Sequence, residues 1–321
     1  MRRFGLALLV VVALAAVGAP WLSPNPPDRR FPELLYAPPT PVHIVAGGLT
    51  APFIYKHRLV SRLERRFDDD TGHPVVLRWL SRDGFVTADP DAGAPLLLLG
   101  ADAFGRDLFS RLLQASRVTL ALALVATLGA TLLGVLLGAV AGYAGGRIDG
   151  ALMRVSEFLL VLPAVYVVLA LRAALPLVVE PSTTFLALAC IFTVFGWPLV
   201  AKGVRGIVAS EREREYVHAA RALGAGPARI LLTHIVPSVR GHVAAQATLL
   251  LPAFILAEAT MSYIGFGFPD RMPTWGTLLQ DAANVSMLSE APWTLAPAGA
   301  IFVVVLGVNL VLQRSGRVPV Q

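Results

Sequence analysis

The chain has 321 residues, of which 55% are hydrophobic and only 15% are charged. A soluble domain of this length needs far more charge to cover its surface, so the composition indicates a polytopic α-helical membrane protein. The formal net charge of +6 comes from loop arginines, and no stretch interleaves aromatic residues with a basic patch, which argues against a nucleic-acid partner. The single cysteine, Cys190, excludes a disulfide framework or a thiolate metal cluster within the chain, and we expect no metal site.

Apolar runs predict the transmembrane helices. About 20 consecutive apolar residues cross the hydrocarbon core as a helix. We expect about six such helices, at residues 4–22, 118–141, 152–179, 183–200, 243–264 and 295–312. The first run also has the basic start and the small-residue end of a cleaved signal peptide. We interpret residues 1–22 as a retained first helix, because its apolar run is about long enough to span the bilayer.

Residues 23–115 form a polar insert after the first predicted helix. The insert is rich in proline early, and short β-like runs occur at residues 42–46 and 75–80. The charged residues 62–72 are typical of a surface helix or turn. We therefore expect a small, partly β, external subdomain, and both a functional role and a passive loop remain open for it.

The second predicted helix carries Gly134, Gly138 and Gly142 at four-residue spacing. A stripe of small residues lets another helix approach closely, so it predicts helix packing and indicates nothing about a substrate. We expect residues 116–313 to form the transmembrane core and residues 314–321 to form a tail.

Basic residues indicate which side of the membrane each loop faces. Short cytoplasmic loops collect lysine and arginine, whereas long loops cross largely regardless of charge. The stretch between the fourth and fifth predicted helices holds Lys202, Arg205, Arg212, Arg214, Arg221, Arg229 and Arg240. We therefore expect this stretch and both termini to lie in the cytoplasm, and the long insert to lie outside.

That basic stretch contains a polar segment, residues 211–240, with the pattern of a helical hairpin. Acidic residues cluster at its start, as the helix dipole favours. Gly224 is expected to cap the first helix in a left-handed conformation, Pro227 to begin a second helix, and Pro237 to close it. Small alanines leave a thin surface that fits a groove on a partner protein.

Residues 215–237, EYVHAARALGAGPARILLTHIVP, resemble the EAA loop of ABC-importer permeases. Four other stretches, in the same order as in the dipeptide/oligopeptide permease subfamily, extend the resemblance over most of residues 99–312: LGADAFGRDLFSRLLQASRVTL, GYAGGRIDGALMRVSEFLLVLPAV, GWPLVAKGVRG and YIGFGFPDRMPTWGTLL. The resemblance implies the type I ABC-importer permease fold. It assigns ATPase coupling to Glu215, Tyr216, Ala219, Ala220, Gly224, Pro227, Ile230 and Pro237.

Two features depart from the subfamily pattern. The ending VNLVLQRSGRVPVQ lacks the usual acidic tail, and Lys202 stands where an arginine is usual. The lysine keeps the charge but loses the planar fork that binds a carboxylate with two parallel hydrogen bonds.

The resemblance also implies partners and a location. We expect two ATPase subunits on the EAA loop, a second permease subunit that completes the pore as a heterodimer, and an external solute-binding protein that the insert helps to dock. The expected location is the inner membrane, and peptides are the expected substrates. The chain has no GxxxxGK[ST] phosphate loop, so we expect it to bind no cofactor and to be no enzyme, with ATP hydrolysed by its partners.

Ionisable and polar residues inside transmembrane helices are candidates for the translocation path. Glu258 is the main candidate, with Gln246 and Asn309 beside it, although a purely structural hydrogen bond remains open for Glu258. Two other classes of protein are alternatives. An intramembrane hydrolase would show HExxH or GxSxG, and neither motif occurs, so we expect no catalytic residues. A secondary transporter usually shows an inverted repeat, and none is visible.

Overall fold

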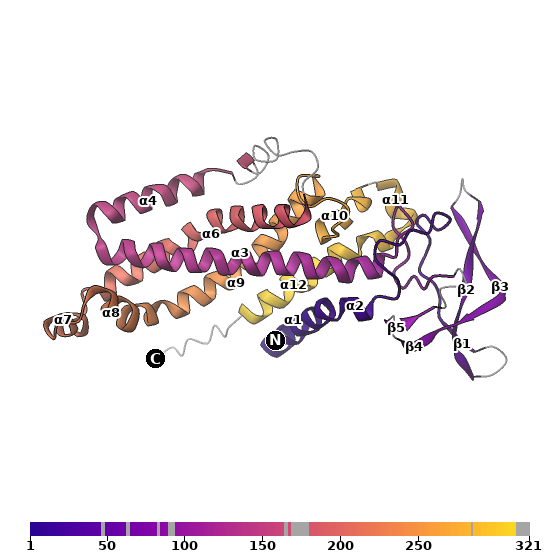
Figure 1. Ribbon diagram of the computed structural model, residues 1–321, viewed down its shortest axis with the longest axis horizontal. Coiled ribbons are helices and arrows are strands. Elements are labelled where there is room, and N and C mark those ends of the chain that lie inside the picture. The colour runs from indigo at the N-terminus through magenta and orange to yellow at the C-terminus, as the bar shows by residue number, and fades with distance from the viewer. Residues whose placement is uncertain are drawn as a thin grey trace. The chain divides into compact units, whose positions relative to one another are not determined.

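The computed structural model describes residues 1–45, 49–61, 65–81, 84–88, 94–163, 166–167, 180–283 and 285–312 (Figure 1). The chain divides into two compact units. The first comprises Met1–Thr119 and Ala259–Gln321, and the second comprises Leu120–Glu258. Two long helices, α3 (Leu108–Ala144) and α9 (Arg240–Tyr263), contribute residues to both units.

Four helices in the described residues are long and apolar enough to cross a membrane: Leu108–Ala144, Pro181–Glu211, Pro227–Tyr263 and Pro292–Leu312. They coincide with four of the six predicted transmembrane helices. The first predicted helix is helical as α1 (Arg2–Val17) and α2 (Ala19–Leu22), but each of these is short. The third is helical at its start as α4 (Gly146–Val161), and residues 168–179 lie outside the described residues.

In the first unit, α1 lies along α12 (Ala296–Leu312) (Figure 1). The start of α1 meets the end of α12, because a Cβ atom on Gly5 would come within 2.7 Å of the Gly307 carbonyl oxygen. Short helical segments precede α12: α10 (Trp275–Leu279), η4 (Asp281–Ala283), α11 (Val285–Glu290) and η5 (Pro292–Leu295). This arrangement places α1 beside a helix that can span the membrane.

The insert is partly β, as expected, with five strands in its described part. They are β1 (His43–Val45), β2 (Leu49–Ser61), β3 (Arg66–Val76), β4 (Arg78–Ser81) and β5 (Gly84–Thr87). They form an antiparallel sheet in the order β1-β2-β3 and a β4–β5 pair. Ile54 and Leu77 pack with Ala94 and Leu96 in a small core.

The expectation of a helix or turn for the charged residues 62–72 is wrong from Arg66 onward, because strand β3 begins there. Three acidic residues in β3 lie opposite three basic or imidazole side chains in β2, and opposite charges across strands stabilise a sheet. The pairs are Lys56 with Asp70, His57 with Asp69, and Arg58 with Asp68. Residues 62–64 lie outside the described residues.

In the second unit, α3 packs on α6 (Pro181–Glu211) through the predicted glycine stripe. A Cβ atom on Gly134 would come within 2.5 Å of the Val200 Cβ, one on Gly138 within 2.6 Å of the Ala201 carbonyl oxygen, and one on Gly142 within 2.6 Å of the Arg205 carbonyl oxygen. The stripe therefore permits close helix packing, as the sequence predicts. On another face of α6, Phe192 stacks on Phe254 of α9 with ring centroids 5.3 Å apart.

Candidate functional site

The predicted coupling segment, residues 211–240, begins at the end of α6. That helix runs on to Glu211, eleven residues beyond the predicted end at residue 200. After a turn, α7 (Glu215–Ala222) carries Glu215 in its first turn, where the positive end of the helix dipole favours a carboxylate. Val217 is the buried residue of α7, and the other α7 side chains are exposed or half-buried.

The turn after α7 has the geometry that requires glycine. Gly224 has φ +83°, its N–H donates to the Arg221 carbonyl, and the Ala225 N–H donates to the Ala220 carbonyl, each at 3.0 Å. This pair of bonds is a left-handed C-terminal cap, which confirms the prediction. A Cβ atom on Gly224 would meet no atom within 4 Å. The backbone angle, and not crowding, therefore makes glycine necessary here.

The second arm of the hairpin does not end where the sequence predicts. Pro227 begins α8 (Pro227–Arg229), as expected, and the chain continues as a π-helix η2 (Ile230–Ile235) and a 3-10 helix η3 (Val236–Val239) into α9. The expected closure at Pro237 is therefore wrong. The missing N–H of Pro237 interrupts an α-helical ladder, but the π and 3-10 turns bond to other carbonyls and carry the helix past it.

The coupling segment has an apolar inner side and an exposed outer side. Val217, Ile230 and Ile235 are each at most 1% exposed, and α7 contacts η2. On the outer side, Leu223 is 89% exposed and Leu232 is 67% exposed. Small and apolar side chains on an exposed helix of this kind fit a groove on another protein.

Tyr216 ties α7 to the end of α6. Its hydroxyl donates a 2.7 Å hydrogen bond to Glu211 Oε2, and its ring lies 6.4 Å from that of His234. Partial burial and the bond to Glu211 raise the pKa of Tyr216. The exposed Ala219 and the half-buried Ala220 follow on the same helix. Helix α7 contacts η2, which begins at the predicted coupling residue Ile230.

Two arginines hold the base of the segment, although the sequence marks them only as basic residues of a predicted cytoplasmic stretch. Arg212 donates to the carbonyl oxygen of Tyr143 at 3.0 Å and so caps the end of α3. Arg205 donates to both carboxylate oxygens of Asp149, and the first of these bonds is 2.9 Å. The sequence feature that points to these contacts is the GGRID turn, residues 145–149, which connects α3 to α4 and contains Asp149. Gly145 and Gly146 both have positive φ in this turn. Nearby, Lys202 lies 3.7 Å from Glu157.

The candidates for the translocation path are dispersed. Glu258 is 1% exposed, and Gln246 is half-buried twelve residues earlier on α9, about 18 Å away along the axis. Asn309, in α12, is exposed, and its Nδ2 donates to the Val305 carbonyl at 2.9 Å. The burial of Glu258 agrees with a side chain that faces protein and not lipid, and its role in transport stays a prediction.

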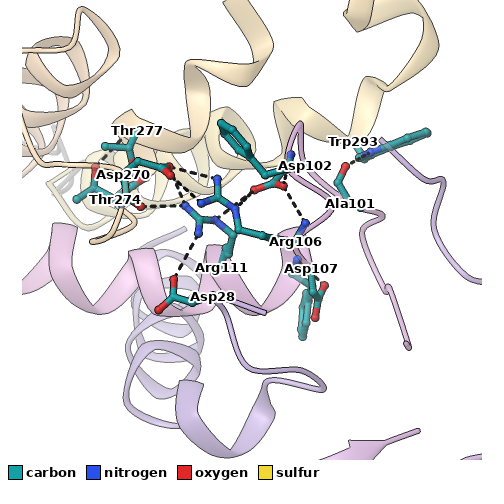
Figure 2. A network of polar contacts seen from close by, with 12 residues as sticks. Asp28, Ala101, Asp102, Arg106, Asp107, Arg111, Asp270, Thr274, Thr277 and Trp293 are labelled. Atoms are coloured by element: carbon teal, nitrogen blue, oxygen red, sulfur yellow. Dashed lines mark hydrogen bonds and ion pairs between the residues drawn. The ribbon is translucent and has the colours of Figure 1, made fainter. Parts of the chain in front are cut away.

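A buried ionic network lies in the first unit, in a place that the sequence analysis did not single out (Figure 2). Arg106 donates from Nε to Asp102 Oδ2 at 2.6 Å and from its terminal nitrogens to both oxygens of Asp270, at 2.7 and 3.2 Å. Arg111, which is fully buried, donates to Asp270 Oδ1 at 3.3 Å and lies 3.7 Å from Asp28.

The network joins two of the stretches that carry the family resemblance. Arg106 and Asp270 are 164 residues apart in the chain, and Trp275, five residues after Asp270, donates from Nε1 to Ser116 Oγ at 3.1 Å. Burial would raise the pKa of Asp270, but its bonds with Arg106 and Arg111 outweigh that effect and hold the pKa below its usual value. The loop after α9 is thereby fixed to the start of α3.

Asp107, next to the network, has a different environment. Its carboxylate accepts hydrogen bonds from Ser110 Oγ and, at 3.1 Å, from Asn25 Nδ2, but no cation faces it within the described residues. Burial raises the pKa of Asp107 to about 6, although these hydrogen bonds oppose the shift.

Comparisons with known proteins identify the family of the chain. Residues 134–318, which include the coupling segment, match the family model described as binding-protein-dependent transport system inner membrane component. The oligopeptide transport system permease protein OppC of Bacillus subtilis (strain 168) is 36% identical over 213 residues, covering 66% of this chain and 67% of that protein. OppC of Escherichia coli (strain K12) is 38% identical over 218 residues, covering 66% and 68%.

Among solved structures, an inward facing form of the MetNI methionine ABC transporter is similar, with 17% identity, a TM-score of 0.46, and coverage of 63% of this chain and 94% of that one. The family match spans more than half of the chain. The chain therefore belongs to the family of binding-protein-dependent transport system inner membrane components, which are multi-pass permeases of ABC importers.

Proposed function

We propose that this chain is one of two permease subunits of an ATP-driven peptide importer, and that residues 211–240 couple it to two ATPase subunits. The exposed outer side of α7, above the buried Val217, Ile230 and Ile235, carries the proposal. Relatives named for oligopeptide transport support peptides as the substrate class. The chain binds no cofactor in this proposal, because its partners hydrolyse ATP.

The coupling residues act through shape. Glu215, Tyr216, Ala219 and Ala220 lie on α7, and the cap at Gly224 sets the angle at which the chain enters α8. Closure of the ATPases on ATP moves this hairpin, and α9 follows, because the helical run from Pro227 to Tyr263 is continuous.

Reconstitution tests which partner subunits the chain needs for transport. The purified chain alone should neither hydrolyse ATP nor transport peptide. Together with a second permease, two ATPases and the binding protein, it should take up peptide only when ATP is present. Uptake by the chain without ATPases would point to a secondary transporter, and peptide cleavage by the chain alone would point to a hydrolase.

The orientation is tested by cysteine labelling in intact cells, after Cys190, the free cysteine of the chain, is replaced by serine. We propose that residues 202–240 and both termini lie in the cytoplasm, and that the insert lies outside. An impermeant thiol reagent should modify a cysteine placed at Thr71 and not one placed at Ser210. The reverse labelling pattern would invert the topology.

Glu258 is proposed to line the translocation path.

The insert is proposed to help dock the solute-binding protein. Deletion of residues 38–90 should lower binding-protein affinity and uptake while leaving the helices of the second unit intact. Unchanged affinity and uptake would make the insert a passive loop.

A further inference from the structure

An exposed aromatic cluster, formed by Trp21, Trp79 and Phe85, joins the insert to the end of α2. The ring centroid of Phe85 lies 5.2 Å from that of Trp21 and 5.9 Å from that of Trp79, both edge-on. The three side chains are 37–53% exposed, and Leu80 beside Trp79 is 70% exposed. Large apolar side chains gathered on one surface mark a site of contact with a protein or a membrane.

The cluster continues an apolar stripe on α1. Val10, Leu14 and Val17 are 54–78% exposed and precede Trp21 at helical spacing, so the four lie on one face. Because α1 packs along α12, which can span the membrane, this exposed stripe is in a position to contact lipid. Tryptophan is enriched where a membrane helix meets the headgroups, and Trp21 stands at the end of such a stripe.

A pocket of about 550 Å³ lies beside the cluster. It is lined by Pro20 of α2, by Ser23 directly after α2, and by Thr87, two residues beyond Phe85 in β5. Its cationic members are Arg29 and Arg117, both exposed. Among the described residues, no acidic side chain lines the pocket, and the partners of the two guanidinium groups are the Gln114 amide and the Phe31 ring and not a carboxylate.

The position of Arg117 in the chain indicates the depth of the pocket relative to the membrane. Arg117 directly precedes Val118, where the apolar run of α3 begins, so its guanidinium belongs at the headgroup region. Its terminal nitrogen donates to Gln114 Oε1 at 3.2 Å, and Arg29 lies over the Phe31 ring at 5.3 Å, which leaves donors of both for an anion. Arginine binds phosphate oxygens through two parallel N–H groups.

We propose that this surface binds an anionic phospholipid, with the headgroup phosphate between Arg29 and Arg117 and the aromatic cluster at the level of the acyl-chain ester bonds. The inference rests on the placement of α1 in the membrane and not on peptide transport. A bound lipid of this kind would hold the β4–β5 pair on the bilayer surface.

The phosphate arm of the test uses thermal unfolding of the purified chain in detergent, titrated with phosphatidylglycerol, phosphatidylcholine or inorganic phosphate. Phosphatidylglycerol should stabilise the chain, and the double variant Arg29→Gln, Arg117→Gln should need roughly 30-fold more lipid for the same shift. The matched control Arg58→Gln, Arg66→Gln removes two exposed arginines from β2 and β3 and should respond as the unaltered chain does.

Equal stabilisation by inorganic phosphate would make the pocket a site for free phosphate and overturn the lipid proposal. Equal loss of lipid response in the control would show that only total charge matters, which also overturns it.

The aromatic arm measures tryptophan fluorescence in nanodiscs of brominated lipid. Bromine near the headgroup end of the acyl chains should quench fluorescence more strongly than bromine near the methyl end, and Trp79→Phe should reduce that quenching. Fluorescence of Trp79 that is insensitive to brominated lipid but changes when the binding protein is added would replace the lipid with a protein partner. Both experiments measure contact with lipid and not transport. A negative result would therefore overturn the lipid site without bearing on the proposed function.

Discussion

Replacement of Gly224 by alanine should weaken docking of the ATPases, and with it transport, without unfolding the chain. The added methyl group meets no atom within 4 Å, so no steric clash contributes. The cost comes from φ +83°, which a residue with a Cβ atom adopts at about 1–2 kcal/mol. That energy lowers the ratio of molecules with a capped turn to molecules with an open turn by about 5- to 30-fold. A partner that binds only the capped hairpin should lose apparent affinity by up to the same factor.

Gly226, two residues later, is the matched control. A Cβ atom there also meets nothing within 4 Å, but its φ is −70°, which any residue adopts. Gly226→Ala should therefore retain the ATPases, whereas Gly224→Ala should lose them on purification, together with uptake and binding-protein-stimulated ATP hydrolysis. Gly224→Asn, which tolerates the left-handed region better, should lie between the two.

Full retention of the ATPases by Gly224→Ala would refute docking through the capped hairpin. A fall of several degrees in the thermal midpoint of this variant, without a fall in Gly226→Ala, would refute it as well. In that case the turn would serve the packing of the permease itself and not the docking of a partner.

Three other variants test the packing, the buried acid and the path. Gly138→Ala should destabilise the chain by about 1–3 kcal/mol, because its Cβ would lie 2.6 Å from the Ala201 carbonyl oxygen. The control Gly206→Ala, whose Cβ would meet no atom within 4 Å, should not destabilise it. Equal thermal midpoints for the two variants would refute close packing of α3 on α6. Asp107 has a folded pKa of about 6 against about 3.9 when unfolded, so its contribution to stability falls by roughly 2 kcal/mol as pH rises from 4 to 6. Asp107→Asn should remove that slope from the thermal midpoint, and an unchanged slope would contradict the assignment. Glu258→Gln should alter uptake rates according to peptide charge, and equal rates for all peptides would leave Glu258 a structural residue.

The long helices could be predicted because each carries about 20 apolar residues, and the cap at Gly224 could be predicted because only a few residue types adopt positive φ. Other features depended on contacts that the sequence does not display. The acidic run Asp68–Asp70 looks like a turn until β2 supplies the opposite charges. Similarly, α6 runs past its apolar stretch because Arg205 and Arg212 bind α4 and the end of α3.

The ionic network was the hardest feature to predict. Arg106 and Asp270 are complementary in sign, but 164 residues separate them, and no spacing rule joins a residue before one long helix to a residue after another. Pro237 led to a wrong prediction, namely the end of a helix where the helical run continues. Proline often ends an α-helix, but at Pro237 the π and 3-10 geometry of residues 230–239 lets the helical run continue.

The π-helical turn at Ile230–Ile235 also fixes a rotational phase. A π-turn is an α-helix with one residue inserted, and one residue corresponds to about 100° of rotation about the axis. The turn therefore determines which face of α9 lies in line with the exposed side of α7. Deleting a single residue such as Leu232 would leave every apolar run intact, yet it would rotate the hairpin by about a quarter of a turn against the helix that follows it. At this point, then, the count of residues matters more to the orientation of the hairpin than their chemical identity.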